Sequence, residues 1–327
     1  MKLQQFRQLD QLVVKEYLGA RGNWSANEPH LRLSWSNWGF GTEDLADSVK
    51  RLAHCGVMYV ELHGNRYGPD LGYRGPEVRK VLEDHGLAVS GVCGMVTPEQ
   101  EFASLLPHVR QRMIDYTRRC IELCVETGGS YVLFGAGAVG RPIRYDDNEM
   151  ARAAETMRIV ADDFVMSGIH GCIEPIRPDE TSLVHTFAEA DYLISLINHP
   201  GIQHFNGDLY HILSGEEHIG TTLLKYGERM INLHLADTNR RALSSGMLDM
   251  DIVIMALYAR NYQRRVAYCT AEPLGPGANP FVALFGQPNQ TVLDDLVMRT
   301  AACFYERDAE LREASDDELL RAYQVDK

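Results

Sequence analysis

The amino-acid sequence predicts an α/β protein, a closed (β/α)8 barrel with an N-terminal arm and a C-terminal helical tail. Short β-rich runs alternate with amphipathic helical runs along the chain. Eight strand–helix pairs follow one another between residues 31 and 306, a number that favours a closed barrel over a doubly wound sheet. The 327 residues, of which 45% are hydrophobic, suffice for one domain of that size.

The predicted elements alternate strictly. The strands are expected at residues 31–35, 57–63, 87–93, 130–134, 169–174, 203–208, 230–234 and 265–272. The helices are expected at residues 43–55, 77–85, 103–126, 148–166, 186–198, 216–226, 249–260 and 291–306. Residues 1–30 contain apolar positions and predict a packed arm before the barrel domain, residues 31–306. Residues 307–327 predict a charged helical tail.

Composition limits the possible partners. The formal net charge of −13 argues against binding to nucleic acid or to anionic membranes. No run of about 18 apolar residues is present, and the first residues lack the apolar core of a signal peptide. The seven cysteines include no C-x-x-C pair, which favours structural thiols in a reducing compartment. We therefore expect a cytoplasmic protein.

Predicted strands five to eight each end in a potential metal ligand. These residues are Glu174, Asp208, His234 and Glu272. The C-terminal ends of barrel strands meet at one face, where three carboxylates would repel one another unless a cation lay among them. One imidazole with three carboxylates suits a divalent metal; Mn²⁺ is favoured, and Mg²⁺, Co²⁺ or Zn²⁺ are alternatives. Taken singly, each acid could be a strand-end charge or an N-cap, and the histidine a core residue.

This ligand set resembles that of the sugar isomerase/epimerase superfamily of xylose-isomerase-like TIM barrels, and most closely the ketose 3-epimerase branch. Three further offsets match over residues 31–306. A Glu six residues after the first ligand is Glu180, and a His three residues after the Asp is His211. An Arg six residues after the His is Arg240, with Arg241 as the alternative. The resemblance implies that Glu180, His211 and Arg240 contact the hydroxyls of a sugar.

The resemblance also implies metal-assisted enolisation of a keto sugar. Glu174 and Glu272 would flank the substrate on opposite faces, one removing a proton beside the carbonyl and the other returning one. His211 and His63 are further catalytic candidates, since His63 ends the second strand near the barrel mouth and titrates near neutral pH. The alternative, that His63 is a packed residue at the end of the strand without a catalytic role, stays open.

Two tryptophans mark the end of the first predicted strand. Trp35 and Trp38 lie where aromatic rings could stack on a sugar or on the ring of an aglycone. Filling of the core is the alternative for both.

Two features depart from a compact epimerase and resemble the large subunit of bacterial C-glycoside deglycosidases. They are the arm, residues 1–30, and the Gly/Pro-rich loop 272–288. This resemblance implies cleavage of the carbon–carbon bond of a 3-oxo-glucosyl C-glycoside, by deprotonation at C2 and elimination of the aglycone from C1. It also implies a small β-rich partner subunit. We take this lyase as the first functional expectation, favoured if the aromatic mouth is roomy, and a ketose 3-epimerase or related isomerase as the alternative. An oligomer is expected.

Three other interpretations are weaker. Metal nucleases share the barrel but need more histidine ligands and a basic groove, which the acidic balance disfavours. A sugar-binding barrel without activity is disfavoured by the complete ligand set. The Gly-rich run 134–140 has the glycine spacing of a dinucleotide loop, but no helix is predicted to begin at its end.

Overall fold

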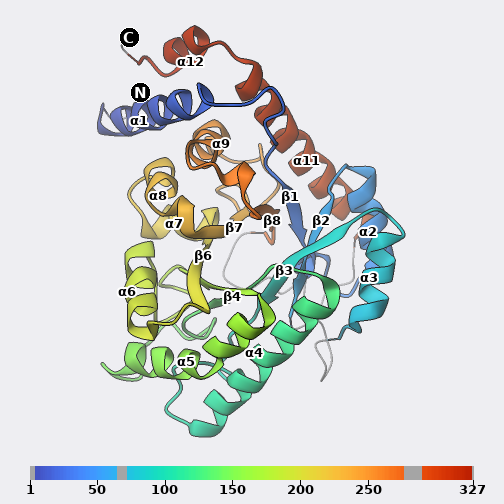
Figure 1. Ribbon diagram of the computed structural model, residues 1–327, viewed down its shortest axis with the longest axis vertical. Helices are drawn as coiled ribbons and strands as arrows, with labels where there is room; N and C mark the ends of the chain where they lie inside the picture. Colours follow the sequence, from blue (N-terminus) through green and yellow to red (C-terminus); the bar gives the residue numbers. More distant parts are fainter. Residues whose placement is uncertain (1–3, 65–71, 276–288, 326–327) are drawn as a thin grey trace.

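The computed structural model describes residues 4–64, 72–275 and 289–325. Its eight parallel strands form a closed barrel in sequence order, with β8 paired back to β1 (Figure 1). The strands are β1 (Leu33–Ser36), β2 (Tyr59–His63), β3 (Ala88–Gly94), β4 (Tyr131–Gly135), β5 (His170–Glu174), β6 (Ile202–Asp208), β7 (Met230–Leu235) and β8 (Tyr268–Ala271). The predicted fold class is confirmed.

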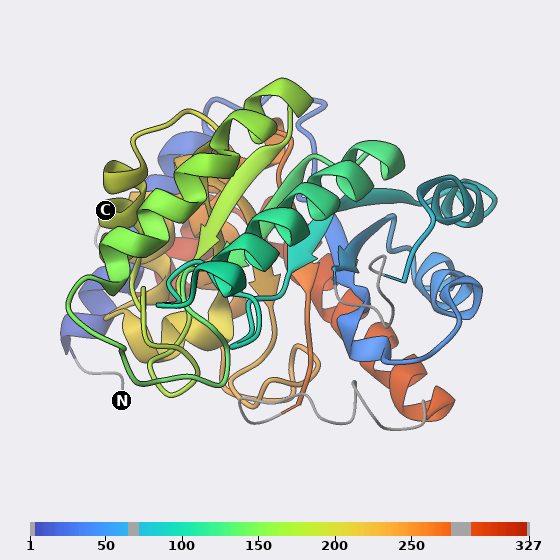
Figure 2. The same cartoon turned by 90° about the horizontal axis from the view of Figure 1, so that it is seen from below.

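Helices surround this barrel. They are α1 (Gln4–Arg21), α2 (Leu45–His54), α3 (Gly75–Glu83), α4 (Pro107–Thr127), α5 (Glu149–Ser167), α6 (Phe187–Ile197), α7 (Leu209–Gly215), α8 (Ile219–Tyr226), α9 (Met250–Ala259), α11 (Gln290–Glu313) and α12 (Asp316–Ala322), with short 3-10 helices η1 (Asn37–Phe40), η2 (Gly227–Arg229) and η3 (Tyr262–Arg264). Figure 2 shows α4 and α5 side by side on the outside of the strands. Among the helices of the described residues, none combines the length and apolarity needed to cross a membrane.

Alternation along the strands divides the barrel wall into two faces. Residues such as Val60, Val132 and Phe205 belong to the large hydrophobic core that includes the surrounding helices. Tyr131, Leu133 and Cys172 belong to a separate buried cluster. Because successive strand residues point to opposite faces, the side chains that share a face with Cys172 include Glu174, two residues further along β5. The strand geometry thus aims the last side chain of β5 into the barrel.

One short helix after strand six was not predicted. The helix expected at residues 216–226 is present as α8, and the additional helix α7 precedes it. The Asp208 carboxylate caps α7 by accepting a hydrogen bond from the Tyr210 N–H at 2.7 Å. The His218 imidazole caps α8 by accepting from the Thr221 N–H at 3.2 Å. Helix α7 is too short to show a helical period, so the sequence did not reveal it.

The N-terminal arm is a helix packed against the outside of the helix layer. Val13, Val14 and Tyr17 of α1 are fully buried, and α1 lies against α8 and α9. The Tyr17 hydroxyl donates to the Leu311 carbonyl at 2.8 Å, and Figure 1 shows α1 beside α12. The arm therefore contacts the tail and the outer helices. Of the Gly/Pro-rich loop after β8, residues 276–288 lie outside the described residues.

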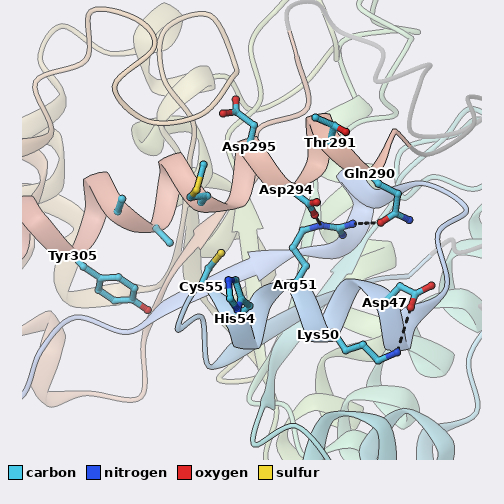
Figure 3. Close-up of a pocket in the computed structure, with 13 residues that line it drawn as sticks. Asp47, Lys50, Arg51, His54, Cys55, Gln290, Thr291, Asp294, Asp295 and Tyr305 are labelled. Carbon is cyan, nitrogen blue, oxygen red and sulfur yellow. Dashed lines mark hydrogen bonds and ion pairs between the residues drawn. The ribbon is translucent and has the colours of Figure 1, made fainter.

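A groove of about 1030 Å³ lies on the outer layer between α2 and α11 (Figure 3). At its edge the Arg51 guanidinium makes two hydrogen bonds, of 2.6 and 2.7 Å, to the Glu43 carboxylate. Arg51 Nε also donates to Asp294 Oδ1 at 2.6 Å, which ties α2 to α11. None of the residues named above as candidate ligands or substrate contacts lines this groove. Its size therefore says nothing about the site at the strand ends.

Candidate metal centre and active site

The four predicted ligands stand together at the C-terminal ends of β5 to β8. Glu174 and Asp208 are the last residues of β5 and β6; His234 lies one residue before the end of β7, and Glu272 directly follows β8. Backbone pairing fixes this arrangement, because Asp208 is opposite His234 and the Glu272 N–H donates to the Leu235 carbonyl at 2.9 Å. All four side chains are buried.

The spacing of these side chains fits one divalent cation. His234 Nδ1 lies 3.5 Å from Glu272 Oε2, 3.6 Å from Glu174 Oε1 and 3.9 Å from Asp208 Oδ2. These distances are too long for good hydrogen bonds. They are short enough for ligands of one ion, because two bonds of about 2.1 Å place their donor atoms at most about 4.2 Å apart. One ligand atom from each of Glu174, Asp208 and His234 falls within a common 4.8 Å.

Electrostatics supports the same interpretation. Burial raises the pKa of Glu272 to about 8, and the negative charge of Asp208 adds to the rise. A carboxyl that is this hard to ionise needs a compensating positive charge if it is to act as a carboxylate at neutral pH. A bound divalent cation is the strongest such charge a site can contain. The donor set therefore fits a divalent metal ion.

The cavity beside the candidate ligands gathers four more of the predicted site residues. It has a volume of about 30 Å³, room for an ion and one or two water molecules. Its lining includes Trp38, Glu180, His211 and Arg240 together with Glu174, His234 and Glu272. The structure thus places the predicted sugar-binding residues around the predicted ligands. The wide aromatic mouth expected for the lyase is not present among the described residues.

Glu180 reaches this cavity from the loop between β5 and α6. The loop is held from outside by the β4–α5 loop, because the Gly140 N–H donates to the Glu180 carbonyl at 2.8 Å. A side chain at Gly137 would overlap Thr181 Oγ1. The Gly-rich run 134–140, which has dinucleotide-loop spacing, therefore serves here for close packing of two loops. Glu180 is 3% exposed, and its Oε1 has no hydrogen-bond partner among the described residues. Burial raises its pKa to about 7.

His211 and Arg240 complete the wall on the other side. His211 is in the first turn of α7, and its Nε2 lies 3.5 Å from Asp208 Oδ2. Its Nδ1 is buried and finds no hydrogen-bond partner in the part of the chain that the structure describes. Burial lowers its pKa, which favours neutral imidazole. Arg240 has a backbone φ of 54°, and its Nη2 lies 3.9 Å from Glu272 Oε2. Its neighbour Arg241 is exposed, so Arg240 is the arginine that faces the cavity.

The two tryptophans take different positions. The chain turns into η1 after Ser36, which brings Trp38 to the cavity, where it stacks on His63 with ring centroids 4.5 Å apart. Trp35 is 1% exposed and stacks on Phe40 inside the core. Core filling, one of the two interpretations open for Trp35, describes its place in the structure. His63 is buried behind Trp38 and does not itself line the cavity.

One charged residue of the site was missed by the sequence analysis. Glu61 lies on β2, two residues before His63, and is completely buried. Its Oε1 is 2.9 Å from His234 Nε2, the ring nitrogen on the side away from the other carboxylates. The sequence contains one indication of this position. Residues two apart on a strand point to the same face, so in Val60-Glu-Leu-His63 the acid Glu61 shares a barrel face with His63.

Comparisons with known proteins identify relatives of this chain and structures that share its fold. The chain is 23% identical over 243 residues to the ketose 3-epimerase of Arthrobacter globiformis, covering 72% of this chain and 80% of the relative. Among solved structures, an L-ribulose 3-epimerase superposes with a TM-score of 0.74 at 16% identity, covering 89% of this chain and 98% of the other.

Two further solved structures share the fold. The D-allulose 3-epimerase of Methylomonas sp. has a TM-score of 0.71 at 17% identity, covering 85% of this chain and 98% of the other. The 3-keto-D-glucoside 4-epimerase from E. coli has a TM-score of 0.68 at 20% identity, covering 84% of this chain and 99% of the other. The family model described as xylose isomerase-like TIM barrel matches residues 49–290. The chain therefore belongs to the xylose isomerase-like TIM barrel family.

Proposed function

We propose that this protein is a divalent-metal-dependent epimerase of a keto sugar, with a free ketose epimerised at C3 as its reaction. The observation that carries the proposal is the convergence of three buried carboxylates on Nδ1 of His234. The named activities of the relatives, all sugar epimerases, support the same class of reaction. This choice reverses the order of the two functions expected from the sequence.

The protein side chains supply the proton transfers and the orientation of the sugar. A bound divalent cation supplies Lewis acidity, which makes a C–H bond beside a carbonyl easier to break. Glu174 and Glu272 come from strands three positions apart in the barrel, so one can remove a proton and the other can return one. Glu180, His211 and Arg240 present one acid, one imidazole and one guanidinium that can bind sugar hydroxyls.

We propose Mn²⁺ as the metal, because three of the four donors are carboxylates and hard, oxygen-rich sites suit this ion. Mg²⁺, Co²⁺ and Zn²⁺ compete for the same donors. Trp38, stacked on His63, offers a ring face at the cavity on which a sugar can pack. His63 remains a candidate acid or base in this proposal. In the structure it stacks on Trp38 and does not itself line the cavity.

A second candidate is the lyase that cleaves a 3-oxo-glucosyl C-glycoside. The observation that favours it is the E. coli neighbour, whose name shows that this fold accommodates a 3-keto-glucoside. Removal of a proton from the carbon beside the ketone is common to both fates: this carbon is C3 of a ketose and C2 of a 3-oxo sugar. The lyase would then expel the aglycone from C1, with a proton donor at the leaving carbon. The cavity of about 30 Å³ among the described residues is too small for a ketose as well as for an aglycone, so its volume does not decide between the two functions. A small β-rich partner subunit belongs to this candidate alone.

Nuclear magnetic resonance in D₂O with added Mn²⁺ tests both functions. Ketohexoses are offered in one tube and a 3-oxo C-glucoside in another, the latter with and without a candidate small subunit. Deuterium at C3 of a ketose, together with its epimer, is the expected result. Release of free aglycone would establish the lyase instead. A size measurement of the same sample tests the expected oligomer.

A further inference from the structure

The carboxylate of Glu61 is buried beneath the metal centre and is fully engaged. Its Oε1 and Oε2 lie 2.9 and 3.2 Å from His234 Nε2. Oε2 also accepts hydrogen bonds from the Tyr131 hydroxyl at 2.6 Å and from Asn232 Nδ2 at 3.1 Å. A carboxylate accepts, so the imidazole must donate through Nε2. The ring is therefore fixed with Nδ1 facing the other carboxylates.

Further polar contacts fix Glu61 itself. Tyr131 lies 3.4 Å from the Ser90 hydroxyl, which is 2.8 Å from the Ser34 hydroxyl. On the other side, Thr270 Oγ1 donates to Asn232 Oδ1 at 2.7 Å. These contacts come from β1, β3, β4, β7 and β8, so the carboxylate is held by strands all around the barrel. A side chain held in this way cannot turn without breaking several buried hydrogen bonds.

Glu61 could instead be a metal ligand, since Glu61, His234 and Glu272 also form a group with donor atoms within 4.8 Å of one another. The orientation of the ring decides between the two roles. Glu174, Asp208 and Glu272 approach Nδ1, whereas Glu61 approaches Nε2. The two nitrogens of one imidazole point in different directions, so one ion cannot use both. A separation of 2.9 Å is that of a hydrogen bond.

We propose that Glu61 is a positioning residue of the metal centre, which orients His234 by accepting its Nε2–H and makes Nδ1 a better donor to the ion. This inference rests on the proposed metal-dependent function. Its physical basis is that an imidazole hydrogen-bonded to a carboxylate is held in one tautomer and one orientation and binds metal more strongly. The role needs no contact between Glu61 and the sugar.

The test is Mn²⁺ affinity, measured by electron paramagnetic resonance of free Mn²⁺ without any sugar present. Glu61→Ala is expected to weaken binding about 100-fold and Glu61→Gln about tenfold, since the amide still offers an oxygen to Nε2–H. Glu43→Gln is the matched control, because Glu43 is an equally buried acid that pairs with Arg51 on the outer layer. The control is expected to bind Mn²⁺ like the unmutated protein.

A double-mutant cycle separates positioning from general support of the barrel. If Glu61 acts through His234, then Glu61→Ala in a His234→Ala background changes the affinity by no more than about twofold. The same large loss in both backgrounds would overturn the inference, as would Glu61→Ala binding like the unmutated protein. Absence of Mn²⁺ binding by the unmutated protein would overturn the metal-dependent function itself. Circular dichroism of each variant confirms that the barrel is folded.

Discussion

Glu180→Gln should stabilise the metal-free protein at alkaline pH while removing a sugar contact. Burial raises the pKa of Glu180 from 4.5 to about 7. Between these values the folded protein keeps the proton that the unfolded chain has released, so stability falls as pH rises from 4.5 to about 7. Above pH 7 the folded protein bears the full free-energy cost of burying the ionised Glu180 carboxylate. Glutamine has no charge to bury and avoids this cost.

The magnitude follows from the same pKa. The rise from 4.5 to about 7 corresponds to about 3 kcal/mol at pH 8, taking about 1.4 kcal/mol for each pH unit. The Gln amide still lacks a partner for one buried polar atom, which costs about 1 kcal/mol. The net gain is about 2 kcal/mol. For a chain of 327 residues this raises the melting temperature by about 3 °C.

Differential scanning calorimetry of the metal-free protein at pH 5 and pH 8 measures this gain. Asp179→Asn is the matched control: the neighbouring acid accepts a hydrogen bond from Arg177 Nε at 2.5 Å, and this bond lowers its pKa. The control should not raise the melting temperature at pH 8. The reasoning is refuted if Glu180→Gln gains nothing at pH 8, or gains equally at pH 5.

Three further changes test other parts of the structure. Glu272→Gln is expected to abolish turnover and weaken metal binding at least tenfold, because it neutralises one donor; full activity with normal metal content by mass spectrometry would contradict the site. Gly137→Ala should raise the KM for the sugar several-fold with little effect on Mn²⁺ affinity, since the added methyl group overlaps Thr181 beside Glu180. An unchanged KM in steady-state kinetics would argue that packing of the β4–α5 loop does not position Glu180. Arg51→Ala should lower the free energy of unfolding in urea by roughly 3 kcal/mol while Mn²⁺ affinity is kept, since it removes the guanidinium that pairs with the buried Glu43 carboxylate. Loss of metal binding with retained stability would contradict that separation.

The barrel and its four candidate ligands could be predicted because both depend on local pattern. Few folds other than a closed barrel accommodate eight consecutive strand–helix pairs. A parallel barrel brings the C-terminal ends of all its strands to one face. A residue at the end of a strand is therefore placed by its position in sequence alone. Glu174, Asp208, His234 and Glu272 were found by this rule, and the structure brings their side chains together.

Glu61 could not be found in this way because it is inside β2 and below the strand ends. Its partner is identified only when the barrel closes and β7 faces β2 across the interior. Trp35 and Trp38 show a related limit. They are three residues apart, and the turn into η1 after Ser36 decides that one packs in the core and the other lines the cavity. No periodic pattern predicts that turn.

Asp208 shows why helix α7 was missed. The residue faces the metal centre and also caps the helix, since its Oδ1 accepts the Tyr210 N–H while its Oδ2 lies 3.9 Å from His234 Nδ1. One carboxylate thus serves the site with one oxygen and the fold with the other. The short helix follows immediately and places His211 beside the site.

The central claim is that one divalent cation binds between the ends of β5 and β8. Anomalous diffraction from crystals soaked in Mn²⁺ tests it directly. The account predicts one strong peak per chain, within bonding distance of Glu174, Asp208, Glu272 and Nδ1 of His234, with Glu61 on the far side of the imidazole. A peak bonded to Glu61 and Nε2, or no peak at the strand ends, would contradict it.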